Sequence, residues 1–243
     1  MSTTAAPSLE AVETHAGGEF FCRALEGRGF GSIYQPSVLV AGCGAGHEAV
    51  FIQQRFDARV EAIDIEVQPN EKYVNWPGMN FQPASVEDMP FSDACFDAVF
   101  YHHVIEHVGD PAQSLQEIAR VLGPDGWLFL GTPNRHRLIS AVGSHEQTDW
   151  ESTAANKLKE NVQDWWARLR GRFRNEYGAH AGFATGELDR MLAQRFADRH
   201  WLTKDYLRFK YREHPIRPAI GLATTAPLRW CLAPSIYVIC RKG

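Results

Sequence analysis

The chain has 243 residues, 44% of them hydrophobic, which is enough for one α/β domain with a buried core. Its formal net charge of -4 at pH 7 offers no bulk attraction for nucleic acid. No run approaches the ~20 apolar residues of a membrane span, and the first residues lack the basic and apolar pattern of a signal peptide. Five cysteines without CxxC spacing are typical of reduced thiols. We therefore expect a cytoplasmic protein with neither a nucleic-acid nor a membrane partner, and the composition leaves the oligomeric state open.

The first half of the chain alternates between strand-like and helix-like stretches. Residues 1–36 are expected to form a helical lid, and after it strands are predicted at 37–41, 59–65, 79–84, 96–103 and 127–132, with helices at 47–56 and 110–122. Asp110 and Pro111 are typical of a helix start, and the PDG at 124–126 predicts a turn. This rhythm predicts an α/β fold with a doubly wound, mostly parallel sheet, whose ligands bind at the carboxyl ends of the strands.

From residue 133 onward the regular alternation stops. Helices are predicted at 152–173, where one of Trp165 and Trp166 is expected in the core and the other in a pocket, and at 184–196, with Thr185 as N-cap. Closing strands are predicted at 201–211 and 235–243, around a proline-rich loop. We expect one domain, composed of the lid (1–36), a cofactor-binding core (37–135), a helical insertion (136–183) and a C-terminal part (184–243). The lid, the insertion and the proline-rich loop are expected to roof the site.

A glycine run follows the first predicted strand in VLVAGCGAG. Gly42 would permit a tight turn, Gly44 would let a ligand approach the backbone, and Gly46 would let the next helix pack closely. Asp64 ends the second strand 20 residues after Gly44, where a carboxylate can accept both hydroxyls of a ribose. A plain turn is the alternative interpretation. The dinucleotide pattern GxGxxG would need glycine where His47 stands, so the pattern favours an adenosine ligand other than NAD.

Several longer stretches extend this pattern, namely AIDI, SVEDMPFSDACFDAVFYHHVIEHVGDPAQSLQEIARVLGPDGWLFLGTPNR and GAHAGFATGELDRML. With the glycine run, they resemble class I S-adenosylmethionine-dependent methyltransferases, specifically the small-molecule group that includes the ubiquinone-biosynthesis enzymes. The resemblance covers roughly residues 37–135 and 178–195. It implies a seven-stranded Rossmann-like sheet, S-adenosylmethionine as cofactor and a small-molecule acceptor. The chain departs from the family at Val40 and Ser85, where acidic residues are usual.

The resemblance also implies a cofactor site. The glycine turn would line the methionine part of the cofactor, Asp64 would hold the ribose, Ser85 and Val86 would meet the adenine edge, and Ile65 and Met89 would sandwich the ring. The carbonyl ends of the fourth strand would meet the amino group. The residues assigned to the cofactor are Gly42, Cys43, Gly44, Gly46, Asp64, Ile65, Ser85, Val86, Met89, Tyr101 and His102. Glu48 either adds negative charge near the cofactor's cation or only complements the helix dipole.

The candidate catalytic residues are His103, His107 and His180. His103, Glu106 and His107 have i, i+3, i+4 spacing, which places them on one face of a helical turn. Three roles stay open for this group: bracing the strand end, general base catalysis, and divalent-metal binding completed by His145 or His180. Metal-binding relatives carry E-x-x-E-H here, and His103 replaces the first acid. No residue is therefore assigned as a metal ligand, and His180 is the alternative base.

The function expected from these patterns is methyl transfer to a small-molecule hydroxyl, such as that of a sugar, a glycan precursor or a specialised metabolite. The arginine run at 168–175 is either a solvated helix face or a site for an anionic acceptor. Asn134 and Arg135 either lie beside the acceptor or are turn residues. Nitrogen and carbon acceptors, and a cofactor-binding subunit without catalysis, stay open as alternatives. A nucleic-acid methyltransferase and an NAD-dependent oxidoreductase are disfavoured by the net charge and by His47 respectively.

Overall fold

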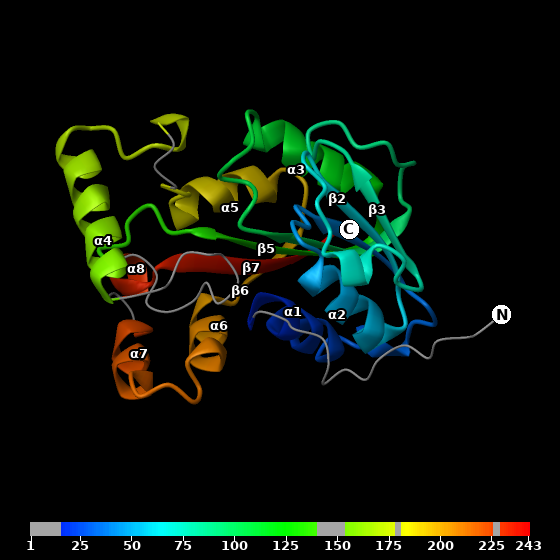
Figure 1. The fold of residues 1–243 in the computed structure, drawn as a ribbon, viewed down its shortest axis with the longest axis horizontal. Helices are drawn as coiled ribbons and strands as arrows, with labels where there is room; N and C mark the ends of the chain where they lie inside the picture. The colour runs from blue at the N-terminus through cyan, green and yellow to red at the C-terminus, as the bar shows by residue number, and fades with distance from the viewer. Residues whose placement is uncertain (1–15, 140–153, 178–180, 226–228) are drawn as a thin grey trace.

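A seven-stranded sheet of order β3-β2-β1-β4-β5-β7-β6 runs through the middle of the molecule (Figure 1). The computed structural model describes residues 16–139, 154–177, 181–225 and 229–243. All neighbouring strands are parallel except that β7 is antiparallel to both β5 and β6. The doubly wound, mostly parallel sheet is therefore confirmed. The strands are β1 (Ser37–Ala41), β2 (Arg59–Asp64), β3 (Met79–Pro83), β4 (Phe96–His102), β5 (Leu122–Pro133), β6 (Asp198–Trp201) and β7 (Ser235–Arg241).

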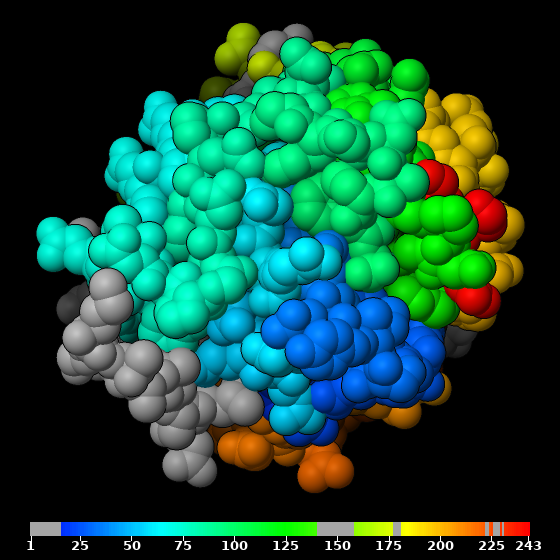
Figure 2. Space-filling view, turned by 90° about the vertical axis from the view of Figure 1, so that its right-hand side faces the viewer, coloured from blue at the N-terminus to red at the C-terminus, as the bar shows by residue number. Residues whose placement is uncertain are grey.

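Helices cover both faces of this sheet, with α1, α2 and α6 on one face and α3 and α5 on the other (Figure 1). The helices are α1 (Ala16–Glu26), α2 (His47–Phe56), α3 (Pro111–Val121), α4 (Ala154–Leu169), α5 (Thr185–Ala193), α6 (Thr203–Lys210), α7 (Arg217–Ala223) and α8 (Arg229–Leu232). Short 3-10 turns are η2 (Phe30–Ser32), η3 (Glu71–Tyr73) and η4 (Asn175–Tyr177). The opposite end of the molecule from α4 faces the viewer in Figure 2.

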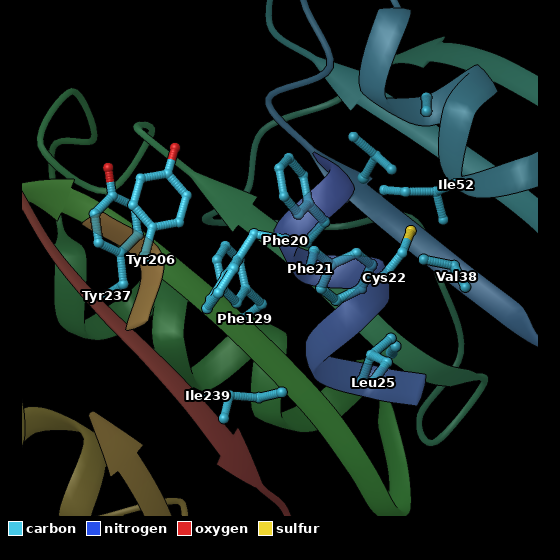
Figure 3. Close-up of a cluster of buried hydrophobic side chains, with 14 of the residues drawn as sticks. Phe20, Phe21, Cys22, Leu25, Val38, Ile52, Phe129, Tyr206, Tyr237 and Ile239 are labelled. Atoms are coloured by element: carbon cyan, nitrogen blue, oxygen red, sulfur yellow. The ribbon is translucent and has the colours of Figure 1, made fainter. Parts of the chain in front are cut away.

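The inner strands β1 and β4 are buried on both faces, as a central position in a parallel sheet requires. In β1, Val38 and Val40 belong to one core cluster, whereas Leu39 and Ala41 belong to the other. Figure 3 shows the first cluster, where the aromatic rings of α1 pack against Phe129 of β5. The predicted N-terminal lid is thus joined to the sheet through the apolar face of α1.

Several sequence predictions about element boundaries are wrong. The stretch 201–211 is not a strand, because β6 ends at Trp201 and α6 follows; its buried residues Thr203, Tyr206 and Leu207 recur at helical spacing. The strand predicted at 127–132 begins five residues earlier, and the PDG turn lies inside it as a bulge with Asp125 at φ 61. Thr185 is the first residue of α5, and Ala184 is its N-cap.

The helical insertion also differs from its prediction. Helix α4 ends at Leu169, four residues before the predicted end. Trp165 and Trp166 are 48% and 55% exposed, so the expectation that one of them lies in the core is wrong. Within the described ranges, no helix combines the length and apolar character needed to cross a bilayer.

Candidate functional site

The glycine turn between β1 and α2 has positive φ at all three glycines: 79° at Gly42, 47° at Gly44 and 87° at Gly46. A Cβ at Gly42 would meet Val104 Cγ2 at 2.1 Å, and one at Gly46 would meet Phe81 Cζ at 2.7 Å. A Cβ at Gly44 would meet nothing within 4 Å. Two glycines therefore serve close packing, while Gly44 leaves its backbone open at the carboxyl edge of the sheet.

Asp64 ends β2 beside this turn, because β1 and β2 are adjacent in the sheet. Its Oδ2 accepts a hydrogen bond from the Gly44 N–H at 3.0 Å, and its Oδ1 accepts one from the Glu66 N–H at 3.4 Å. Beneath them Cys43 is buried; burial, and to a lesser degree the charge of Asp64, raises the pKa of its thiol to about 12. The open backbone and the carboxylate thus form one unit, and Cys43 is a neutral packing residue under it.

The loop after β3 contains the residues expected to meet adenine. The Ser85 hydroxyl accepts a hydrogen bond from the Glu87 N–H at 3.1 Å and so shapes a local turn. Val86 and Met89 are buried in the second core cluster, whereas Ile65 is 76% exposed at the end of β2. The predicted sandwich therefore pairs an exposed side chain with one that packs mainly in the core.

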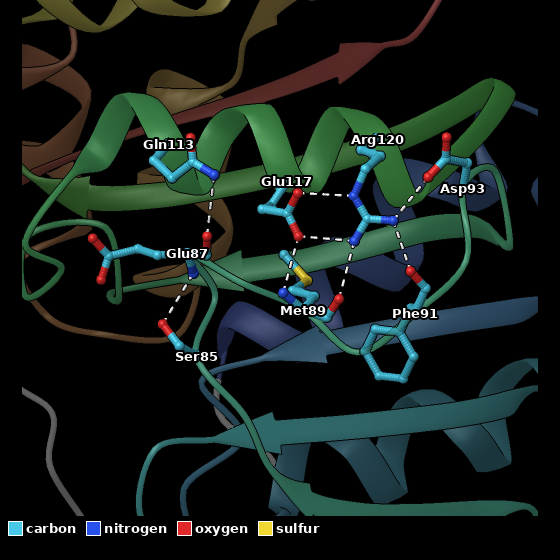
Figure 4. A network of polar contacts seen from close by, with 8 residues as sticks. All are labelled: Ser85, Glu87, Met89, Phe91, Asp93, Gln113, Glu117 and Arg120. Carbon is cyan, nitrogen blue, oxygen red and sulfur yellow. Dashed lines mark hydrogen bonds and ion pairs between the residues drawn. The ribbon is translucent and has the colours of Figure 1, made fainter.

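Two residues that the sequence analysis did not single out hold this loop against α3 (Figure 4). Arg120 donates to the carbonyls of Met89 and Phe91, at 3.0 and 2.7 Å, and to the carboxylates of Glu117 and Asp93. Glu117 in turn accepts a hydrogen bond from the Met89 N–H at 2.9 Å. The signal for this clamp was an opposite-charge pair at i, i+3 on the inner side of a helix.

The side chains of Tyr101 and His102, at the end of β4, are engaged in contacts within the protein. The Tyr101 hydroxyl donates to Ser114 at 3.1 Å inside the core. The His102 ring stacks on Phe100 and Tyr237, and glycines on both sides, Gly17 of α1 and Gly131 of β5, leave room for it. These two residues would therefore contact a cofactor through their backbone carbonyls. The sequence analysis predicted the same kind of contact, from the carbonyls at the end of this strand to the amino group of the cofactor.

His103, Glu106 and Thr132 join the ends of β4 and β5. Glu106 is 5% exposed; its Oε1 lies 3.2 Å from His103 Nδ1, and its Oε2 accepts from the Thr132 hydroxyl at 3.0 Å. His107 Nε2 lies 4.0 Å from the same carboxylate. Burial alone would raise the pKa of Glu106, but the hydrogen bond and the electrostatic interaction with His103 lower it overall. These contacts join the ends of the two strands, and His103 adopts the left-handed conformation, with φ 56.

The remaining candidate catalytic and metal-binding residues do not form a cluster among the residues that the structure describes. His145 and His180 lie outside the described residues. In the part of the chain that the structure describes, no group of three or more His, Cys, Asp and Glu is placed to hold a metal ion. Asn134 donates to the Ala233 carbonyl at 2.9 Å, and Arg135 pairs with Glu187 at 2.7 Å. Both residues thus anchor the chain after β5.

Comparison with known proteins identifies the core of this fold. Residues 39–130 match the family described as a methyltransferase domain. A protein of Mycolicibacterium smegmatis, named as a probable S-adenosylmethionine-dependent methyltransferase, is 36% identical over 99 residues, covering 40% of this chain and 38% of that protein. The ubiquinone biosynthesis O-methyltransferase of Paracidovorax citrulli is 34% identical over 117 residues, covering 44% and 49%. The chain thus spans less than half the length of either relative.

Solved structures agree with this identification at the level of the fold. The S-adenosylmethionine-dependent methyltransferase of Mesorhizobium loti matches with a TM-score of 0.61 and 14% identity, over 97% of this chain and 100% of that one. The resemblance predicted from the sequence is confirmed in this part of the chain: residues 39–130 match the methyltransferase domain family, and the fold is that of class I, Rossmann-like methyltransferases.

Proposed function

We propose that this chain transfers a methyl group from S-adenosylmethionine to a hydroxyl of a small-molecule acceptor in the cytoplasm, with no nucleic-acid partner. The observation that carries the proposal is the open backbone at Gly44 with the Asp64 carboxylate on its N–H at 3.0 Å. When bound, the cofactor supplies an electrophilic methyl on a positively charged sulfur. The tasks left to the protein are to bind it, to align the acceptor and to exclude water.

The residues around the turn fit an adenosyl ligand. Asp64 would accept hydrogen bonds from the ribose hydroxyls, while the exposed Gly44 backbone would face the methionine part. The exposed side chain of Ile65 would cover one face of the adenine, and the loop carrying Ser85 and Val86 would meet its edge. The Arg120 and Glu117 clamp would keep that loop in place without contacting the ligand.

Within this proposal, His103 is the general base for the acceptor hydroxyl. Glu106 engages Nδ1 of the ring, which directs the proton-accepting role to Nε2. Alignment alone can lower the barrier by about 7–11 kcal/mol, whereas a positioned base typically adds about 10²–10⁴-fold in rate. Alignment of the acceptor with the methyl group is therefore the larger contribution to the rate, and the base adds a smaller one. The name of the Paracidovorax relative supports an oxygen acceptor.

The test is methyl transfer from isotopically labelled S-adenosylmethionine to a panel of hydroxylated metabolites. With an acceptor in hand, His103→Ala is expected to lower kcat by about 100-fold while leaving cofactor affinity unchanged, because the base acts only in the transition state. The matched control is His107→Ala, whose imidazole lies at the longer distance of 4.0 Å from Glu106; it should retain most of the activity.

Three results would contradict parts of this proposal. If His103→Ala lost cofactor binding and fold stability together with turnover, the residue would only brace the strand end. A metal-dependent reaction would instead disappear in EDTA and return with Mg²⁺. If no acceptor were methylated although the cofactor bound, a cofactor-binding subunit without catalysis would become the better account.

A further inference from the structure

Helix α4 carries a row of exposed apolar side chains along one side. Leu158, Val162, Trp165 and Leu169 are spaced by four, three and four residues, so they share one face, which we call the apolar stripe. They are 63%, 38%, 48% and 80% exposed. Trp166, on the margin of the stripe, is 55% exposed. A helix of a globular protein normally turns such a face to the core, so the stripe marks an interaction surface.

The polar side of α4 attaches the helix to the protein. Arg137, only 6% exposed, forms an ion pair with Asp164 at 2.9 Å, and Arg168 donates to the Arg137 carbonyl at 2.6 Å. The Arg168 guanidinium also lies 3.9 Å from the centre of the Phe173 ring. Asp164 and Arg168 are four residues apart and therefore lie on a common face, away from the centre of the stripe. The helix is thus held in an orientation that keeps its apolar side outward.

The charge of this segment is opposite to that of the rest of the chain. Residues 154–174 contain six basic and two acidic side chains, a net charge of +4, so the remaining residues sum to -8 in a chain of net -4. Arg170, Arg172 and Arg174 are exposed at the C-terminal end of the stripe, and Arg170 lies 5.3 Å from the Trp166 ring. Exposed leucine and tryptophan beside arginine is the composition of helices that lie in a membrane interface.

We propose that α4 docks on the surface of an anionic lipid bilayer, with the apolar stripe at the acyl boundary and the arginines on the headgroup phosphates. A helix of 16 residues is about 24 Å long, and it would lie flat on the membrane. The expectation of no membrane partner rested on the lack of a spanning segment, and that property does not report on one helix face.

The position of α4 places the proposed membrane contact at the edge of the sheet that carries the candidate site. The chain leaving β5 contacts α4 directly, through Arg137 and through the Trp165 N–H on the Leu138 carbonyl at 3.0 Å. Helix α4 therefore lies beyond the carboxyl end of β5, and the end of the molecule shown in Figure 2 lies away from it.

A second copy of the chain fits the apolar stripe less well than a membrane does. Both ends of α4 are cationic, so a parallel or an antiparallel pairing of two such helices would bring like charges together.

The test is flotation of the full chain with vesicles of phosphatidylcholine alone, or with about 30% phosphatidylglycerol. The wild type is expected to float with the anionic vesicles, to bind neutral vesicles much less, and to be released at high salt. Leu158→Gln/Leu169→Gln is expected to weaken binding by about 30-fold, because two half-buried leucines each contribute roughly 1 kcal/mol at the interface.

The matched control is Val74→Gln, a comparably exposed apolar residue outside α4, which should leave binding unchanged. Circular dichroism melting would check that every variant is folded. Equal flotation of the wild type and the leucine variant, or no flotation of the wild type, would overturn the proposal. So would a concentration-dependent dimer that the leucine variant loses, since the stripe would then be an interface between copies. None of these readouts depends on methyl transfer, so the membrane proposal and the proposed function fail independently.

Discussion

Gly44→Ala is expected to abolish most cofactor binding while leaving the fold nearly intact. A Cβ at this position meets nothing within 4 Å in the protein, so the stability cost comes from φ 47 alone and should be about 1–2 kcal/mol. The same Cβ would stand where the account places the ligand against the backbone. We expect S-adenosylmethionine affinity to fall by several hundred-fold, or about 3–4 kcal/mol, measured by calorimetry on the variant and the wild type.

The matched control is Gly29→Ala, another glycine with positive φ (80°), where an added Cβ would also meet no atom within 4 Å, but far along the chain from the site residues. It carries the same kind of conformational cost and should leave cofactor affinity unchanged. If Gly44→Ala bound the cofactor as tightly as the wild type, the ligand would not approach this backbone, and the proposed position of the methionine part would be wrong.

Gly42→Ala, unlike Gly44→Ala, is expected to act mainly by lowering the stability of the fold. Its Cβ would lie 2.1 Å from Val104 Cγ2, and the residue would also be held at φ 79. Strain of this kind, added to overpacking, is expected to lower the free energy of unfolding by about 4 kcal/mol. Because Val104 belongs to the loop after β4, the clash would also push the glycine turn away from the loop that carries His103. Chemical denaturation measures the change.

A double-mutant cycle separates the two causes. Val104→Ala removes both γ-methyl groups, so Gly42→Ala/Val104→Ala should recover about 2 kcal/mol relative to the sum of the single variants and leave only the conformational part. Simple additivity of the two changes would mean that Val104 does not limit this turn. Unchanged stability in Gly42→Ala would contradict the packing described for the β1–α2 connection.

The sequence predicted the central sheet well because its strands and helices repeat one simple pattern. The strand 37–41 and the helix 47–56 coincide with β1 and α2. The stretch 201–211 failed because aromatic and β-branched residues favour a strand locally, whereas burial of Thr203, Tyr206 and Leu207 follows the helical period that tertiary packing selects. The outward orientation of α4 could not be predicted, because periodicity reveals an apolar face and does not say what covers it.

For the candidate site, the sequence located the turn and Asp64 but not their supports. Spacing along the chain predicts that strand ends share an edge of the sheet, which is how Asp64 and Gly44 came to be paired. The Arg120 clamp and the Thr132 contact with Glu106 join segments more than 25 residues apart through side-chain reach, which no local pattern encodes. His102 was assigned by its place on β4, and only the structure shows its ring inside an aromatic cluster.

Calorimetric titration of S-adenosylhomocysteine into wild-type protein and Asp64→Ala tests the central claim most directly, since it asks whether the carboxylate at the end of β2 binds the adenosyl ligand. The account predicts saturable binding to the wild type, and an affinity at least about 100-fold lower in a folded Asp64→Ala protein, because two hydrogen bonds to a charged group are lost. Equal affinity in the two proteins, or binding of NAD in place of the adenosyl ligand, would contradict it.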